Sequence, residues 1–152
     1  LAVFNAGRIE QIASPEEIFH TSATRFVAQF MGDSDFLPGV ILENGIRTSL
    51  GVLPQIMKLP AGSLVEIAMR ADDVEISPRE DGCGVITQRF FLGAFNIYKI
   101  QLLGGQVLHA MQPHTAILSP GSRVHTRLNP GHPLSVFHQG LAVELEKFGS
   151  TG

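Results

Sequence analysis

Apolar and polar residues alternate with a period of two in one short stretch after another from residue 46 onward. The stretches 46–50 and 65–70 show this alternation clearly, and a period of two is typical of a strand with one buried face. Glycine and proline interrupt the pattern at short intervals, for example at residues 60–62 and 104–105. Short strands with closely spaced turns favour barrels and sandwiches over βαβ units, so the pattern predicts a mainly β fold with a small antiparallel barrel.

The beginning of the chain follows a different pattern, which predicts a short hairpin. Residues 1–5 and 8–13 are two short stretches with strand character, and the Asn-Ala-Gly sequence at 5–7 suits the turn between them. We therefore expect two paired strands before the first helix.

Two short helices are expected after this hairpin. Ser-Pro-Glu-Glu at residues 14–17 predicts a helix start, because a serine hydroxyl can cap the free amides, proline fits the first turn and the second glutamate completes a capping box. A second helix is expected to begin at Thr21 or Ser22, with apolar residues at helical spacing over 26–31 and an end at Gly32.

The change of period near residue 33 predicts the organisation of the chain. We expect a lead segment over 1–32, a β domain over 33–140 and a frayed tail over 141–152.

The charge balance excludes one class of partner. The chain has 11 basic and 14 acidic residues, a net charge of −3, and no cluster of basic side chains. Affinity for nucleic acids depends largely on neutralised phosphates, so we expect no nucleic-acid partner. Cys83 is the single cysteine, which favours a reducing compartment. No apolar stretch reaches the ~18 residues that a membrane span requires.

Residues 1–32 read LAVFNAGRIEQIASPEEIFHTSATRFVAQFMG. This run resembles the end of the ATPase domain in importer-type ABC transporters, which reads (I/L)AV, GRIEQ, (S/T)PEEI, AT and FVA in the same order. Ser22 stands where many members carry proline. The resemblance implies that the chain is the C-terminal part of a longer ATP-binding subunit.

The following residues resemble the appended TOBE regulatory domain, an OB-like barrel. The matching pieces are Asp-Phe-Leu-Pro-Gly at 35–39, Met-Arg-Ala-Asp-Asp-Val at 69–74 and Phe-Leu-Gly-Ala at 91–94. Ala71 and Asp72 replace the proline and glutamate of the family's middle motif. The resemblance implies an OB-like (TOBE/MOP-like) fold and a regulatory role.

Catalysis is not expected of this chain. ATP hydrolysis requires a Gly-x-x-x-x-Gly-Lys-Ser/Thr loop, and this string is absent from the sequence. Leu-Leu-Gly-Gly-Gln at 102–106 is similar to the ATP-contacting LSGGQ string of ABC proteins, but leucine replaces its serine and alternating strands flank it. We therefore expect a hairpin turn at Gly104-Gly105.

By this resemblance, ATP and Mg²⁺ belong to the parent protein, and this chain holds no cofactor. The implied partners are the transporter membrane subunits, which would place the parent in the cytoplasm on the inner face of the membrane. Ferric iron is the first expected solute, because the TOBE segment looks closest to the iron-type branch. Polyamine, sulfate, molybdate or sugar importers remain open, as does a stand-alone module that binds a small oxyanion such as molybdate.

Several polar and aromatic residues have two interpretations. Arg70 and Asp73 could hold an anionic effector or form a local contact across a turn. The six histidines show no metal-ligand spacing, so no metal site is expected. The aromatic residues Phe90, Phe91, Phe95 and Tyr98 could stack on bases, but the acidic charge favours packing.

The same aromatic residues, with Phe36 and Leu37, could instead form an exposed apolar patch. In the resembling family, regulatory domains of two subunits pack together, so we expect a homodimer. The candidate ligand or interface residues are Phe36, Leu37, Arg70, Asp73, Phe91, Gly93 and Tyr98.

Overall fold

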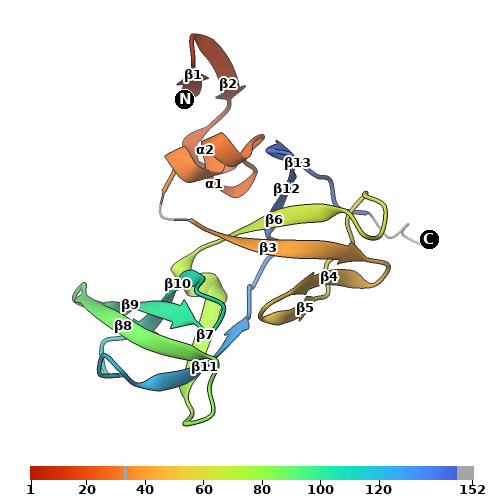
Figure 1. The fold of residues 1–152 in the computed structure, drawn as a ribbon. Coiled ribbons are helices and arrows are strands. Elements are labelled where there is room, and N and C mark those ends of the chain that lie inside the picture. The colour runs from red at the N-terminus through yellow and green to blue at the C-terminus, as the bar shows by residue number, and fades with distance from the viewer. Residues whose placement is uncertain (33, 147–152) are drawn as a thin grey trace, which may run out of the picture. The chain divides into compact units, whose positions relative to one another are not determined.

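The computed structural model describes residues 1–32 and 34–146, and their contacts divide the chain into two compact units (Figure 1). The first unit contains Leu1–Gly32, Phe36–Ala68 and Pro133–Gly152, and the second contains Asp33–Asp35 and Met69–His132. The expected division at residue 33 thus differs from the observed grouping, because strands far apart in the sequence pair within the first unit.

Strands dominate both units. Along the chain the elements are β1 (Ala2–Asn5), β2 (Arg8–Ile12), α1 (Pro15–His20), α2 (Arg25–Phe30), β3 (Asp35–Leu42), β4 (Gly45–Thr48), β5 (Gly51–Leu53), β6 (Leu64–Met69), the 3₁₀ turn η1 (Ala71–Asp73), β7 (Val74–Pro78), β8 (Gly84–Phe91), β9 (Phe95–Leu102), β10 (Val107–Pro113), β11 (Arg123–Leu128), β12 (Ser135–His138) and β13 (Leu141–Ala142). The mainly β fold class, with a hairpin and two short helices before it, is confirmed.

The two helices begin at side-chain caps. The N–H of Glu17 donates to the Ser14 hydroxyl at 3.2 Å, and the N–H of Ser14 donates to the Glu17 carboxylate at 3.0 Å, so the predicted capping box is present. The second helix begins at Arg25 and not at Thr21 or Ser22, because Thr24 caps it by accepting the N–H of Val27 at 3.2 Å.

The first unit contains a six-stranded sheet in the order β13-β12-β6-β3-β4-β5. Its buried positions alternate along the strands, as in β6, where Val65, Ile67 and Met69 are buried. The β1–β2 pair forms a separate two-stranded sheet, and Val3 on this sheet packs with Ile18 and Val27 of the helices.

The segment expected as a frayed tail pairs with the rest of the first unit. Leu141 and Ala142 form β13 beside β12, and Ala142 donates its N–H to the carbonyl of Ala23 at 3.1 Å. Further along, Lys58 donates its N–H to the carbonyl of Glu144 at 2.9 Å. Residues 147–152 of the expected tail lie outside the described residues.

The second unit contains a five-stranded antiparallel sheet in the order β10-β9-β8-β11-β7. Its fully buried side chains come from alternate positions of different strands and include Ile86, Ile100, Leu108 and Val124. The β part of the chain after residue 33 is therefore divided between a six-stranded and a five-stranded sheet.

Candidate functional site

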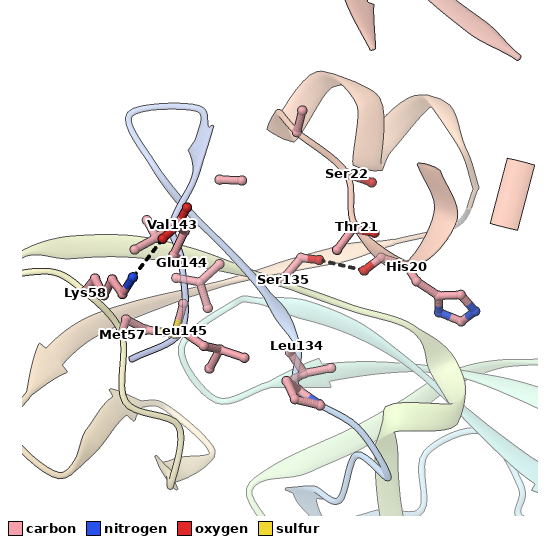
Figure 2. Close-up of a pocket in the computed structure, with 14 residues that line it drawn as sticks. His20, Thr21, Ser22, Met57, Lys58, Leu134, Ser135, Val143, Glu144 and Leu145 are labelled. Atoms are coloured by element: carbon pink, nitrogen blue, oxygen red, sulfur yellow. Dashed lines mark hydrogen bonds and ion pairs between the residues drawn. The ribbon is translucent and has the colours of Figure 1, made fainter. Parts of the chain in front are cut away.

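A hollow of about 520 Å³ lies in the first unit, where the loop between α1 and α2 meets the chain at Met57 and the segments around β12 and β13 (Figure 2). Its polar groups pair with one another. The Lys58 ammonium lies 2.9 Å from the Glu144 carboxylate, the Ser22 hydroxyl donates to the Ile18 carbonyl at 2.8 Å, and the Ser135 hydroxyl donates to the His20 carbonyl at 3.5 Å. This arrangement joins neighbouring segments and offers no converging set of polar groups to a ligand.

A second hollow, of about 480 Å³, lies in the second unit. Phe90, Leu92 and Ile97 from the β8–β9 hairpin form its apolar wall, and Asp35 and His109 supply polar groups. A mostly apolar pocket with a few polar groups is the usual form of a small-molecule site.

Asp35 and His109 form a close pair at this second hollow. The Asp35 carboxylate accepts the backbone N–H of His109 at 2.7 Å, and its other oxygen lies 3.1 Å from His109 Nδ1. The side chain of Asp35 is only 17% exposed. Sequence reasoning missed this pair, because the two residues are 74 positions apart and no local pattern links them.

Arg70 and Asp73 form a local contact at η1. The N–H of Arg70 donates to the Asp73 carboxylate at 2.8 Å, and Nε2 of His132 lies 3.2 Å from the other Asp73 oxygen. Burial raises the pKa of the Asp73 carboxyl, and the hydrogen bond from Arg70 partly offsets this shift. Both carboxylate oxygens are thus engaged within the protein, as the turn interpretation requires.

Two residues of the expected apolar patch are buried. Leu37 and Tyr98 are fully buried, so neither can belong to an exposed surface, because each faces the core side of its strand. The Tyr98 hydroxyl donates to the Ala116 carbonyl at 2.6 Å and accepts the N–H of Leu118 at 3.0 Å. Tyr98 therefore anchors the loop that follows β10.

Phe36 is half-buried in the first unit, and its ring contacts two other side chains of that unit. The Arg25 guanidinium lies 4.0 Å from the centre of its ring, and the Phe137 ring centre lies at 6.4 Å. Phe36 and Phe91 lie in different units, so they do not form one patch within a unit.

Phe91 and Gly93 lie together at the tip of the β8–β9 hairpin. Phe91 is 66% exposed and Leu92 beside it is 57% exposed. Gly93 has φ of +84°, a backbone conformation that glycine adopts without strain. Of the candidate residues, Phe91 and Gly93 are therefore both accessible and lie on the same hairpin.

Neither a metal cluster nor a membrane helix is found in the described part of the chain. Within 1–32 and 34–146, no group of three or more His, Cys, Asp or Glu side chains could hold a metal ion. Within the same residues, no helix is long and apolar enough to cross a membrane.

The Gly104-Gly105 segment is a turn between β9 and β10. Gly105 has φ of +88° and donates its N–H to the Leu102 carbonyl at 2.9 Å. The predicted hairpin turn is confirmed. The ATP-contacting string of ABC proteins opens a helix, whereas this segment joins two strands.

Comparisons with known proteins agree with the mainly β fold. Residues 67–136 match the TOBE domain model. The chain is 35% identical over 128 residues to the spermidine/putrescine import ATP-binding protein PotA of Frankia alni, covering 69% of this chain and 28% of that protein. It is 31% identical to the PotA protein of Acidothermus cellulolyticus over 91% of this chain and 41% of that protein.

A third relative carries a different solute in its name. Over 81 residues, 52% of this chain and 22% of that protein, the chain is 40% identical to the sulfate/thiosulfate import ATP-binding protein CysA 2 of Chromobacterium violaceum. The chain thus spans between 22% and 41% of the length of these three relatives.

Among solved structures, the cytoplasmic molybdate-binding protein ModG has a similar fold. The TM-score is 0.53 at 14% sequence identity, covering 68% of this chain and 95% of that chain. This likeness supports the OB-like fold. Residues 67–136 thus match the TOBE domain, and the chain is similar to the TOBE-containing part of importer ABC ATP-binding subunits.

Proposed function

We propose that this chain is the C-terminal regulatory and dimerising part of the ATP-binding subunit of an ABC importer for a polyamine-class solute. The single observation that carries the proposal is the 31% identity with a spermidine/putrescine import protein over 91% of the chain, a share too large to leave out either the lead segment or the TOBE domain. A free-standing regulatory module would have no use for a segment that resembles the end of an ATPase domain.

In this proposal the chain acts without catalysis of its own. The parent subunit binds ATP and Mg²⁺, hydrolyses ATP and assembles with the transporter membrane subunits on the cytoplasmic face of the membrane. A second copy of the chain is the expected partner of the regulatory part. The hollow beside Asp35 and His109 is a candidate place for a regulatory ligand, because an apolar wall and a carboxylate meet there.

The relatives favour a polyamine over ferric iron, the first expectation from the sequence, since their names specify spermidine and putrescine. Sulfate is the second candidate, because a sulfate/thiosulfate import protein is 40% identical over 81 residues. A stand-alone module for a molybdate-type oxyanion would explain the fold shared with ModG but not the lead segment.

A chimeric transporter tests the proposed function. The matched segment of the PotA protein of Acidothermus cellulolyticus is replaced by this chain, and spermidine uptake is measured in cells that lack their own polyamine importer. We expect uptake to be restored. A chimeric subunit that accumulates normally but supports no uptake would contradict the polyamine assignment, and sulfate uptake by a matched chimera with CysA 2 would favour the second candidate.

A further inference from the structure

The outer part of β8 is a sheet edge without a partner strand. On one side β8 pairs with β9 along its length, but on the other side β11 pairs only with Gly84 and Val85. Two more hydrogen bonds join Ile86 to Gly121 and Ser122, and the β8–β9 hairpin then extends past the end of β11 (Figure 1). Residues 87–91 therefore form an open edge within the second unit.

The alternation of hydrogen bonds identifies the unpaired backbone groups. Leu92 donates its N–H to the Phe95 carbonyl at 3.0 Å, which makes this a hydrogen-bonded pair. Hydrogen-bonded and non-hydrogen-bonded pairs alternate along an antiparallel ladder, so Phe90 also bonds toward β9. Arg89 and Phe91 then direct their N–H and C=O groups away from β9. In the described part of the chain, no main-chain hydrogen bond outside the strand ladders reaches these two residues, and the β11 ladder pairs only with Gly84 and Val85.

The outer end of this edge carries accessible apolar side chains. Phe91 is 66% exposed, Leu92 57% and Phe90 39%. An exposed edge with a row of unpaired backbone groups is a template for strand addition, and natural edges are usually protected from it by charged side chains or proline. Arg89 is the single charged side chain among residues 87–92.

We propose that the β8 edge binds the same edge of a second copy of this chain, so that the two five-stranded sheets join into one antiparallel sheet across a twofold axis at Phe90. Arg89 of each copy then lies opposite Phe91 of the other, and each of these pairs exchanges two backbone hydrogen bonds. This inference rests on the dimerisation in the proposed function and names the surface that performs it.

Charge favours an axis at Phe90 over an axis at Arg89. If the axis passed through Arg89, the two Arg89 side chains would lie directly opposite each other, and like charges in a cross-strand pair are destabilising. With the axis at Phe90, each guanidinium instead faces an aromatic ring, which attracts a cation through its quadrupole. The two Phe90 rings meet at the axis as a non-hydrogen-bonded pair, in which side chains approach most closely.

A second copy satisfies this edge better than an unrelated strand. The same exposed sequence supplies both sides, so Phe90 meets Phe90 and Arg89 meets Phe91, and the twofold axis brings each outward N–H to an outward C=O. The low proportion of charged residues in the whole chain, 16%, agrees with a surface that is partly covered by a partner.

A charge-exchange series tests the surface and the register. We expect the unmodified chain to be a dimer by light scattering at micromolar concentration, with twice the chain mass of 16.4 kDa. Phe91→Arg should weaken dimerisation by about tenfold or more, because each interface would then hold two facing pairs of like charges. The double variant Arg89→Glu with Phe91→Arg should restore the dimer, because each pair again has opposite charges.

The matched control is Leu103→Arg, which adds the same charge at a residue that is 74% exposed in the turn after β9. It should leave the dimer unchanged. A dimer that persists in Phe91→Arg would overturn the β8 surface but leave the proposed dimerisation standing. A monomeric unmodified chain would contradict both, whereas the uptake test of the chimeric transporter is independent of either result.

Cross-linking tests the position of the axis directly. In a Cys83→Ser background, Phe90→Cys places two sulfur atoms opposite each other at the axis and should give a disulfide-linked dimer after mild oxidation. Arg89→Cys in the same background should not link to itself, because its two copies lie at different levels of the ladder, beyond the reach of a disulfide. Linking through residue 89 and not through residue 90 would overturn the proposed register.

Discussion

Individual residues in this protein show how burial changes the role of a side chain from ligand binding to stability. Asp73 and Tyr98 both suggest a binding surface when the sequence is considered alone. In the structure Asp73 is 3% exposed and Tyr98 is fully buried, and both use their polar atoms to hold backbone segments in place. Their predicted effects are therefore effects on stability.

The pH dependence of stability should contain a contribution from Asp73. Its pKa is raised above the ordinary value of 3.8, first by burial. A carboxyl with a raised folded-state pKa binds its proton more tightly in the folded protein, so its contribution to the free energy of unfolding falls as the pH rises from about 3.8 through the raised value. The Asp73→Asn variant lacks this titration.

The measurement is the free energy of unfolding of both proteins by urea at several pH values. The stability of the unmodified chain relative to Asp73→Asn should decline between acidic and neutral pH. A relative stability that rises over this range would show that the pairing with His132 outweighs burial.

Removing the Tyr98 hydroxyl should destabilise the second unit. Tyr98→Phe leaves the half-buried Ala116 carbonyl and Leu118 N–H without their hydrogen-bond partner, and a typical intramolecular hydrogen bond contributes about 0.5–1.5 kcal/mol. Urea unfolding should report a loss of about this size. The same stability in the variant would mean that the loop after β10 finds other partners for both groups.

At the scale of elements, close approach between strands depends on glycine. A Cβ atom at Gly82 would contact the backbone carbonyl of Val124 on β11, and a Cβ at Gly84 would lie 2.7 Å from the Ile100 side chain and 3.0 Å from the Thr126 hydroxyl. Period-two alternation predicts strands here, but it carries no information about this approach.

Gly82→Ala should therefore be more harmful than an alanine elsewhere in the same unit. A backbone atom cannot move aside as a side chain can, so overpacking should cost about 1–3 kcal/mol or more. Gly104→Ala is the matched control, because nothing lies within 4 Å of its added Cβ and its φ is not positive. Equal thermal unfolding temperatures for the two variants would contradict the close approach of Gly82 to β11.

At the scale of the whole molecule, the segment after β12 completes the first unit. Gly140 accepts the N–H of Arg25 at 2.9 Å, Ala142 bonds to Ala23, Glu144 to Lys58, and Glu146 donates its N–H to the Ile56 carbonyl at 2.9 Å. These bonds join residues that are more than 80 positions apart in the sequence. They belong to the first unit alone.

A truncated chain tests this dependence. Ending the chain at Gly140 should increase hydrogen exchange at Lys58 and in the helices, while Tyr98 and Leu108 in the second unit keep their protection. A chain that ends at Glu146 keeps all four bonds and serves as the control. Equal exchange in the two shortened chains would show that residues 141–146 contribute nothing to the first unit.

Much of the local structure could be predicted because its causes are local. The capping box at Ser14 acts over three residues and the alternation in β6 over two, so both are visible in the sequence and both are confirmed. The second helix start was wrong by a few residues, because Thr21, Ser22 and Thr24 are all chemically able to cap and packing selected Thr24.

The candidate site was predicted less well, since exposure depends on tertiary packing. Phe91 and Gly93 are accessible, but Leu37 and Tyr98 face the core, and no local signal separates the two sets. The Asp35–His109 pair joins residues 74 positions apart. Only strand order and register bring such residues together.

By itself, the sequence determined the mainly β class, the capped start of the first helix, the glycine turn after β9 and the resemblance to importer ATP-binding subunits. All of these follow from residue types within a few positions of one another. The tertiary structure alone decided that the strands form three sheets, that residues 141–146 pair with segments far from them, and that the outer part of β8 remains an open edge. Pairing between distant strands depends on which segments the folded chain brings side by side. The residues next to a strand in the sequence do not specify its distant partner.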